Sequence, residues 1–223
     1  MDDCISGASS ITERERRIED LETVLNRGSF SLKGVAMSGK PPPSKMSLDG
    51  VHVGVGGGKW DPLKDTIGLD IQNVNFAKKK RGKKDQSSEG VIPDKLTRTH
   101  CASRTGEIFD VSGKVAPIVG TFKLSLHELV CSYKLQWDDV IPDNLREVWC
   151  SHFDLIEEIK HLRFKRAIIP DDAVSDIFHT LDFGDASTEI LCVAIYARFL
   201  RKNGEYYCQL LFSRTKIISP PMS

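Results

Sequence analysis

The dipeptide Asn203-Gly204 is the feature that most constrains the fold of this chain, because it lies between two strand-like runs. Residues 190–200 and 205–217 are rich in apolar and β-branched side chains, and Asn-Gly between such runs is the strongest short-range signal for a β-hairpin. Just upstream, Leu181 and Phe183 alternate with polar residues, as they would on a half-buried strand. The last third of the chain is therefore predicted to form three antiparallel strands.

Helical spacing of apolar residues dominates much of the remaining sequence. It predicts helices at residues 9–27, 96–109, 118–134 and 142–162. The first helix has a capping residue among Ser9, Ser10 and Thr12, and Gly28 ends it. Shorter strands are predicted at residues 30–35, 51–55 and 66–74. Helices and an antiparallel sheet in separate parts of the chain predict the α+β class.

Composition excludes several classes of protein. The 223 residues carry equal numbers of basic and acidic side chains, so no global field draws the chain to nucleic acid or to a membrane. A hydrophobic fraction of 40% is enough for a packed core. No apolar run approaches the roughly 20 residues of a membrane span, and the N-terminus lacks the pattern of a signal peptide. We expect an intracellular protein, cytoplasmic or nuclear, without a membrane partner.

The six cysteines are scattered along the chain and are predicted to be reduced thiols, as is usual inside cells. None forms C-x-x-C, and none is expected to pair with a histidine at the spacing of a zinc site. His127 lies in an apolar helical stretch. We expect it to be a packed or surface residue and not a ligand.

A basic run at residues 78–84, followed by a polar stretch, interrupts the apolar periodicity. It contains nothing apolar to bury and is predicted to be a linker or an exposed loop. Two interpretations stay open. The run neutralises nucleic-acid phosphates or serves as a nuclear localisation signal, through Lys78, Lys79, Arg81 and Lys83. Alternatively, it is a solvated loop without a partner.

Five short segments carry recognisable patterns in a fixed order. The chain opens with Asp2-Asp3-Cys4-Ile5-Ser6-Gly7, and Trp60-Asp61-Pro62 with Asp65-Thr66 follows. Residues 102–117 read A-S-x-x-G-x-I-F-D-x-x-G-x-x-A-P, and residues 137–149 read W-D-D-x-I-P-x-x-L and end in a second Trp. Residues 182–187 read D-F-x-D-A-S. Together these segments resemble the polyprotein of Bel/Pao-type LTR retrotransposons, from the end of the reverse transcriptase palm to the start of a ribonuclease H-like domain.

This resemblance implies two-metal phosphoryl transfer, in which clustered carboxylates hold paired Mg²⁺ ions. Asp2 and Asp3 would be metal ligands of the palm, and Asp185 would be the first carboxylate of the ribonuclease H site. The intact parent would be an RNA-directed DNA polymerase with ribonuclease H activity. Its partners would be an RNA or DNA template–primer and the remaining polyprotein domains.

The resemblance also implies a division of the chain into four parts. Residues 1–76 would hold the palm end and the strands that follow it, and residues 77–92 a flexible basic linker. A helical thumb or connection segment would occupy residues 93–170. Residues 171–223 would be a truncated ribonuclease H-like domain that begins with three antiparallel strands.

Both implied metal sites lack parts in this sequence. The palm Tyr and an upstream palm Asp would precede Met1, and the helix that carries the ribonuclease H Glu would follow Ser223. We therefore expect a polyprotein fragment that is inactive alone and binds no ion stably. The alternative is a domesticated nucleic-acid-binding module that uses the basic loop, which predicts salt-dependent binding by a folded monomer.

Two other patterns fail when their spacing is checked. The glycine-rich segment 54–59 suggests nucleotide binding, but Val53 stands where a P-loop needs Gly and Trp60 where it needs Ser or Thr. The segment Asp110-Val111-Ser112-Gly113 has one residue more than the Asp-Ser-Gly of an aspartic protease. Protease activity is therefore predicted to be absent.

Overall fold

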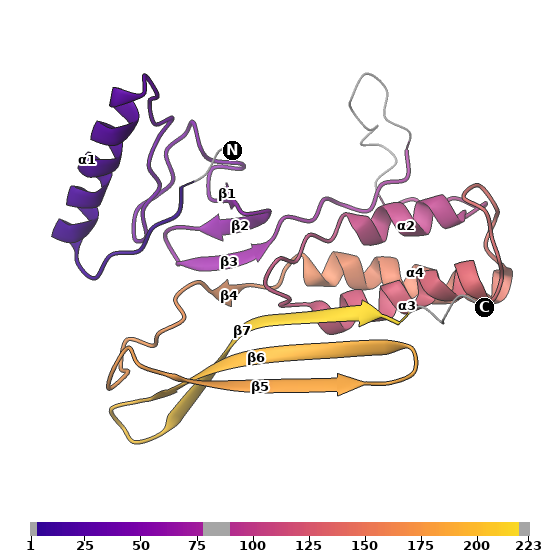
Figure 1. The fold of residues 1–223 in the computed structure, drawn as a ribbon. Coiled ribbons are helices and arrows are strands. Elements are labelled where there is room, and N and C mark those ends of the chain that lie inside the picture. Colours follow the sequence, from indigo (N-terminus) through magenta and orange to yellow (C-terminus); the bar gives the residue numbers. More distant parts are fainter. Residues whose placement is uncertain (1–3, 78–89, 219–223) are drawn as a thin grey trace. The chain divides into compact units, whose positions relative to one another are not determined.

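The computed structural model describes residues 4–77 and 90–218, which combine four α-helices with short and long β-strands (Figure 1). The chain separates into two compact units, residues 1–67 and residues 68–223. Its sheets are antiparallel where their register is defined, so the predicted α+β class is confirmed. No helix in the described ranges is long and apolar enough to cross a bilayer.

Helix α1 (Ile11–Arg27) opens the first unit and confirms the helix predicted at residues 9–27. Ser10 is its N-cap, and the Ser10 hydroxyl accepts the backbone N–H of Glu13 at 3.1 Å, which satisfies one of the free donors of the first turn. The Glu13 carboxylate in turn bonds Ser9, and this bond holds the pKa of Glu13 down at about 2. Gly28 ends the helix as predicted.

A tight hairpin follows in the same unit, formed by strands β1 (Val53–Val55) and β2 (Gly58–Asp61). Gly56 and Gly57 connect them with φ values of 56° and 80°, which is the two-residue turn that glycine favours in hairpins. The glycines that first suggested nucleotide binding therefore serve a turn. Strand β3 (Thr66–Leu69) comes next and spans the boundary between the two units.

Two strand predictions in this region need correction. Residues 30–35 form no strand, because the chain leaves α1 through Ser29 at a φ of 60° and the N–H of Phe30 bonds the carbonyl of Leu25. That bond keeps Phe30 in the helix cap, where its side chain is 69% exposed. The strand predicted at residues 66–74 ends at Leu69.

The second unit contains three helices: α2 (Arg98–Gly106), α3 (Ala116–Cys131) and α4 (Asp143–Ile159). Each lies within the limits predicted from the sequence or two residues outside them. Their apolar faces enclose one core, and its fully buried members include Leu96, Phe122, Leu129 and Trp149. The burial of large side chains such as these stabilises a fold by about 1.5–3 kcal/mol each.

The second unit also holds the predicted three-stranded antiparallel sheet, built from β5 (His179–Ala186), β6 (Ile190–Leu200) and β7 (Tyr206–Ile217) in that order. A short strand, β4 (Phe164–Lys165), precedes them. Gly204 closes the β6–β7 hairpin with a φ of 84°, as the Asn-Gly signal predicted. Among the described strands, β5 pairs only with β6 and so lies at an edge of this sheet.

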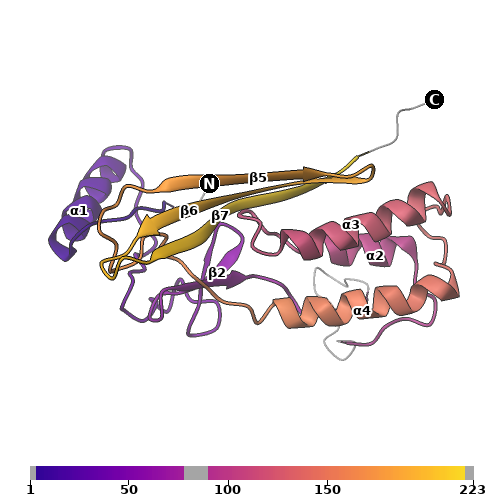
Figure 2. The same ribbon diagram turned by 90° about the horizontal axis from the view of Figure 1, so that it is seen from below.

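Helix α3 packs on β7, and a glycine fixes the contact (Figure 2). Gly113, three residues before α3, lies so close to β7 that a Cβ atom there would sit 1.8 Å from the carbonyl oxygen of Ser213. The N–H of Ser213 donates to Ser112 at 3.0 Å, and its hydroxyl donates to the Gly113 carbonyl at 2.5 Å. Further along, Gly120 lets α3 approach Thr215. The turn before α3 and strand β7 are therefore in direct backbone contact.

Candidate functional site

Asp185, the predicted first carboxylate of a ribonuclease H-like site, lies near the end of the edge strand β5. Its side chain is exposed, and Oδ1 accepts the N–H of the adjacent Ala186 at 2.9 Å. Directly across the strand pair is Cys192, whose side chain points to the same face of the sheet. The carboxylate therefore faces solvent, and its charge is not neutralised by an ion pair with any described residue.

An apolar surface lies beside Asp185 on the same face. Phe183 is 57% exposed and makes an edge-on contact with Tyr196, at 5.9 Å between ring centroids. A shallow apolar depression surrounds the two rings, and Leu181, Ala194 and Cys208 line the rest of it. An exposed carboxylate beside the exposed Phe183 ring is a surface suited to contact another molecule.

The described residues do not fit a two-metal site. Asp182 is the nearest acidic residue on the strand, but it pairs with Ile195 across β6 while Asp185 pairs with Cys192. The two aspartates are an odd number of positions apart along β5, so their side chains point to opposite faces. Among the described residues no group of three His, Cys, Asp or Glu side chains could hold a metal ion. Asp185 therefore has no described companions with which to position a pair of ions.

The other predicted site residues lie outside the described ranges. These are Asp2 and Asp3, assigned to the palm, and the candidate phosphate-binding residues Lys78, Lys79, Arg81 and Lys83. Their roles stay predictions.

The segment at Trp60-Asp61-Pro62 and Asp65 serves the fold of the first unit. Asp61 is 4% exposed, and its Oδ1 accepts the N–H groups of Leu63 and Lys64 at 3.0 and 3.1 Å. Asp65 accepts the indole N–H of Trp60 at 3.1 Å. Each carboxylate thus stabilises the turn between β2 and β3.

The segment at residues 102–117 serves the junction of helices and sheet in the same way. Asp110 accepts the N–H groups of Lys114 and Val115 at 2.9 and 2.7 Å, just ahead of α3, where an anion is favoured. Gly113 provides the close approach to Ser213. The Asp-x-Ser-Gly pattern, which suggested an aspartic protease, therefore stabilises the start of α3 and its contact with β7.

The segment at residues 137–149 also stabilises the fold. The Arg98 guanidinium lies 4.1 Å from the ring centre of Trp137. Ile141 is buried, and its N–H donates to the carbonyl of Leu96. Trp149 is 1% exposed in the core. The segment at 182–187 differs from these three, because Asp182, Phe183 and Asp185 are exposed. Residues that the fold does not use are the better candidates for function.

A family comparison decides what this domain is. Residues 97–222 match the model of the Pao retrotransposon-like RNaseH-like domain. The chain belongs to this family. No curated protein and no solved structure matches the chain.

The Pao-type match begins at Thr97, the N-cap of α2, and includes all the helices and strands of the second unit from α2 onward. It confirms the resemblance to Bel/Pao-type polyproteins over these residues. It does not reach residues 1–96, so their resemblance to a reverse transcriptase palm stays a prediction. The predicted boundary at residue 170 falls inside the matched segment, and the four-part division also stays a prediction.

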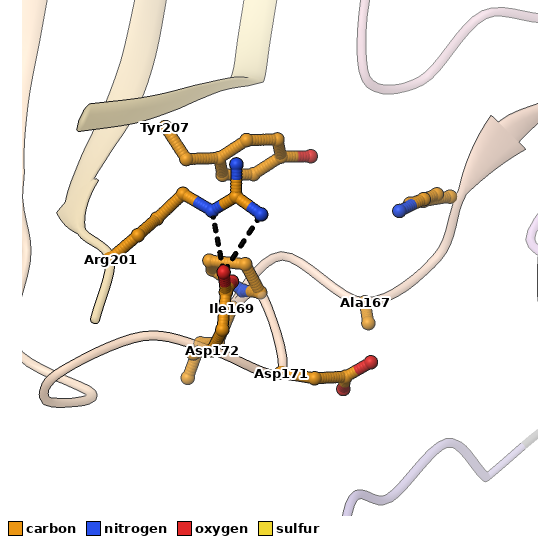
Figure 3. Close-up of a pocket in the computed structure, with 8 residues that line it drawn as sticks. Ala167, Ile169, Asp171, Asp172, Arg201 and Tyr207 are labelled. Atoms are coloured by element: carbon orange, nitrogen blue, oxygen red, sulfur yellow. Dashed lines mark hydrogen bonds and ion pairs between the residues drawn. The ribbon is translucent and has the colours of Figure 1, made fainter. Parts of the chain in front are cut away.

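The Pao-type domain also has a polar cavity of about 390 Å³ at the hairpin end of the β5–β7 sheet, the end opposite to Asp185. Figure 3 shows residues that line it. Arg201 donates from Nε and from a terminal nitrogen to the same oxygen of Asp172, each at 2.8 Å. The hydrogen bond from Arg201 holds the pKa of Asp172 below its usual range. Tyr207 lies next to Arg201, and the Asp171 side chain points away from the ion pair.

Basic residues on the chain leading into this cavity escaped the sequence interpretation. Arg163 donates to the backbone carbonyls of Lys160 and Leu162 at 2.8 Å, so its charge is not neutralised by those bonds. Lys165 is exposed, lines the cavity, and has no carboxylate partner among the described residues. The signal that could have found them is the stretch 160–166, which has four Lys or Arg residues and no acidic residue.

One contact between a histidine and a cysteine was not anticipated from the sequence. His127 and Cys131 lie four residues apart on α3, and the imidazole Nε2 is 3.2 Å from the Sγ atom. The spacing of four was visible in the sequence, but it was not weighed against the helix that carries it. On a helix, residues at this separation face the same side.

Proposed function

We propose that this chain is the nucleic-acid-handling part of a retrotransposon polyprotein: it binds an RNA–DNA hybrid and does not cleave it alone. The family match supplies the class of molecule, because a ribonuclease H-like domain acts on nucleic acid. The observation that carries the proposal is the state of Asp185. It stands exposed on an edge strand beside Phe183, free of any structural task that the fold requires.

Binding needs local positive charge, since the net charge of the chain is zero. Arg163 and Lys165 supply it within the matched domain, because neither is neutralised by a described carboxylate. Each phosphate contact releases condensed counterions, which makes the binding constant fall with salt. Two such contacts give a modest affinity that falls as the salt concentration rises.

Hydrolysis needs ions, and the described residues offer Asp185 without companions. In an intact parent, further carboxylates would complete a Mg²⁺ site around it, where the ions stabilise the attacking and leaving oxygens. In this chain Asp185 by itself leaves the hybrid uncut. Asp185 is thus assigned as one ligand of a shared site.

Salt-dependent binding tests the proposal. The full chain is titrated with a labelled RNA–DNA hybrid at several salt concentrations, alongside the double variant Arg163→Gln/Lys165→Gln. Loss of two phosphate contacts makes the negative slope of log K against log salt shallower by about 2. Lys134→Gln, an exposed lysine just beyond the C-terminal end of α3, is the matched control and keeps the slope. An unchanged slope in the double variant would show that Arg163 and Lys165 do not contact phosphates.

The alternative is a domesticated binding module that relies on the basic run. It places the contacts on Lys78, Lys79, Arg81 and Lys83, which are concentrated in one short stretch of sequence. In the same titration, neutral variants at these four positions then make the negative slope shallower by about 4, while Arg163→Gln/Lys165→Gln leaves the slope unchanged. The two sets of variants separate the two proposals.

A further inference from the structure

The pair His127 and Cys131 lies on α3, apart from Asp185 and from the polar cavity. Nε2 of His127 is 3.2 Å from Sγ of Cys131. Cys131 is an exposed free thiol and His127 is partly exposed. Imidazole nitrogen and thiolate sulfur are the two ligand types that zinc prefers in proteins.

The separation of the two atoms suits one metal ion. With bonds of about 2.05 Å to nitrogen and 2.3 Å to sulfur at a tetrahedral angle, two ligands of one zinc ion lie about 3.6 Å apart. The observed 3.2 Å differs by less than half an ångström. Because both side chains project from the surface of the helix, a small rotation of either one closes that difference.

The spacing of the pair along the helix matches that of a known type of zinc site. Residues 127–131 read His-Glu-Leu-Val-Cys and lie wholly within α3. In the H-E-x-x-H helices of metalloproteases, two ligands at positions i and i+4 bind one zinc ion from a single helix face. Here a thiol stands at the second position. Leu129, between the two ligands, is fully buried, which anchors this turn of the helix in the core.

We propose that His127 and Cys131 chelate a soft divalent cation of the zinc class, with water completing its coordination. On binding, the thiol of Cys131 loses its proton to solvent and the sulfur takes the metal; neutral His127 gives the lone pair of Nε2. The hydrogen bond between the two side chains is thereby replaced by two metal–ligand bonds. With two protein ligands, the site is weaker than a four-ligand structural site, and its affinity rises with pH.

Cobalt titration of the full reduced chain tests the proposal, because a cobalt–thiolate bond gives a sulfur-to-metal charge-transfer band in the near ultraviolet. We expect one cobalt ion per chain with this band, displaced by zinc. Cys131→Ser removes the band, and His127→Gln weakens binding by at least about tenfold. Cys208→Ser, which removes another exposed thiol, leaves both unchanged. Calorimetry with zinc in two buffers of different ionisation enthalpy measures the proton that Cys131 releases.

Several results would overturn the assignment. A band that persists in Cys131→Ser places the metal on another cysteine. Unchanged affinity in His127→Gln reduces the site to an adventitious thiol. Half an ion per chain, with a dimer in gel filtration, means that two copies share the metal. Thermal unfolding of each metal-free variant shows whether it is folded; both positions are on the surface of α3, so we expect stabilities close to that of the wild type.

Discussion

Replacement of Gly113 by Ala should be among the most destabilising single changes in this protein. Gly113 has a φ of 74°, a left-handed conformation that a residue with a Cβ adopts at a cost of roughly 1–2 kcal/mol. In addition, the new Cβ would lie 1.8 Å from the carbonyl oxygen of Ser213 and 2.5 Å from its carbonyl carbon. The obstacle is backbone of β7 and not the end of a flexible side chain, so the strand and the 112–113 turn must move apart.

That movement breaks two hydrogen bonds, from the N–H of Ser213 to Ser112 and from its hydroxyl to Gly113. At about 1 kcal/mol for each bond, added to the backbone strain, the total loss is about 3–4 kcal/mol. Domains of this size are stable by roughly 5–15 kcal/mol. The variant therefore loses a large share of its stability, and the docking of α3 on β7 is weakened most.

Urea unfolding followed by circular dichroism measures this loss. Gly204→Ala is the matched control, because Gly204 has a φ of 84° and, apart from its chain neighbours, no atom within 4 Å of the position that a Cβ would take. It carries the strain without the collision and should lose only about 1–2 kcal/mol. Equal losses in the two variants would refute the close contact between Gly113 and β7. Ser213→Ala, which removes one hydroxyl, should lose about 1 kcal/mol.

Three further predictions concern single side chains. Asp185→Asn should change the free energy of unfolding by less than about 0.5 kcal/mol in the same urea assay, since the exposed carboxylate bonds only its neighbour's N–H; a large loss would mean that Asp185 serves the fold. Cys101 is fully buried, and burial raises the pKa of its thiol to about 12, so a thiol reagent should modify Cys131 quickly and Cys101 only upon unfolding, as mass spectrometry of peptides would show. Burial lowers the pKa of His152 below its usual value of 6.5, so the unfolded chain binds a proton more readily. Stability should therefore be complete above about pH 6.5 and fall at lower pH, and a fall of the same size in His152→Gln would contradict this.

The sequence predicted the sheet well because its signals are local. Asn203-Gly204 fixes a hairpin within a few residues, although nothing in the sequence predicted the irregularity in the β6–β7 register between Ile195 and Tyr196. The helices were equally visible, since a period of 3.6 is a property of one segment. Ser10 and Gly28 bound α1 where the capping rules place them.

The sequence failed in two situations, where a helix cap competes with a strand pattern and where a distant partner decides the outcome. Residues 30–35 are apolar enough for a strand, but the cap that joins Phe30 to Leu25 takes the backbone elsewhere. The contact of Gly113 with Ser213 spans 100 residues, and no periodicity reveals it. The apolar pattern of β5 did not show that Phe183 would be left exposed at an edge of the sheet.

The sequence predicted only part of the candidate site, because some of its residues are recognisable locally and others gain importance only in the folded chain. Asp185 was identified by resemblance, and its position on β5 follows from the alternation around it. Arg163 and Lys165 were missed because their importance depends on which charges remain unpaired after folding. The contact between His127 and Cys131 was missed because a spacing of four residues brings two side chains together only on a helix.

The assay that tests the central claim most directly is incubation of the purified chain with a labelled RNA–DNA hybrid in Mg²⁺ or Mn²⁺, with binding and cleavage followed in the same samples. We predict a retarded complex that dissociates as salt is raised, and an RNA strand that stays intact. Asp185→Asn should bind equally well. Metal-dependent cleavage by the chain, abolished in Asp185→Asn, would contradict the account, because it would show that this chain completes a working metal site around Asp185.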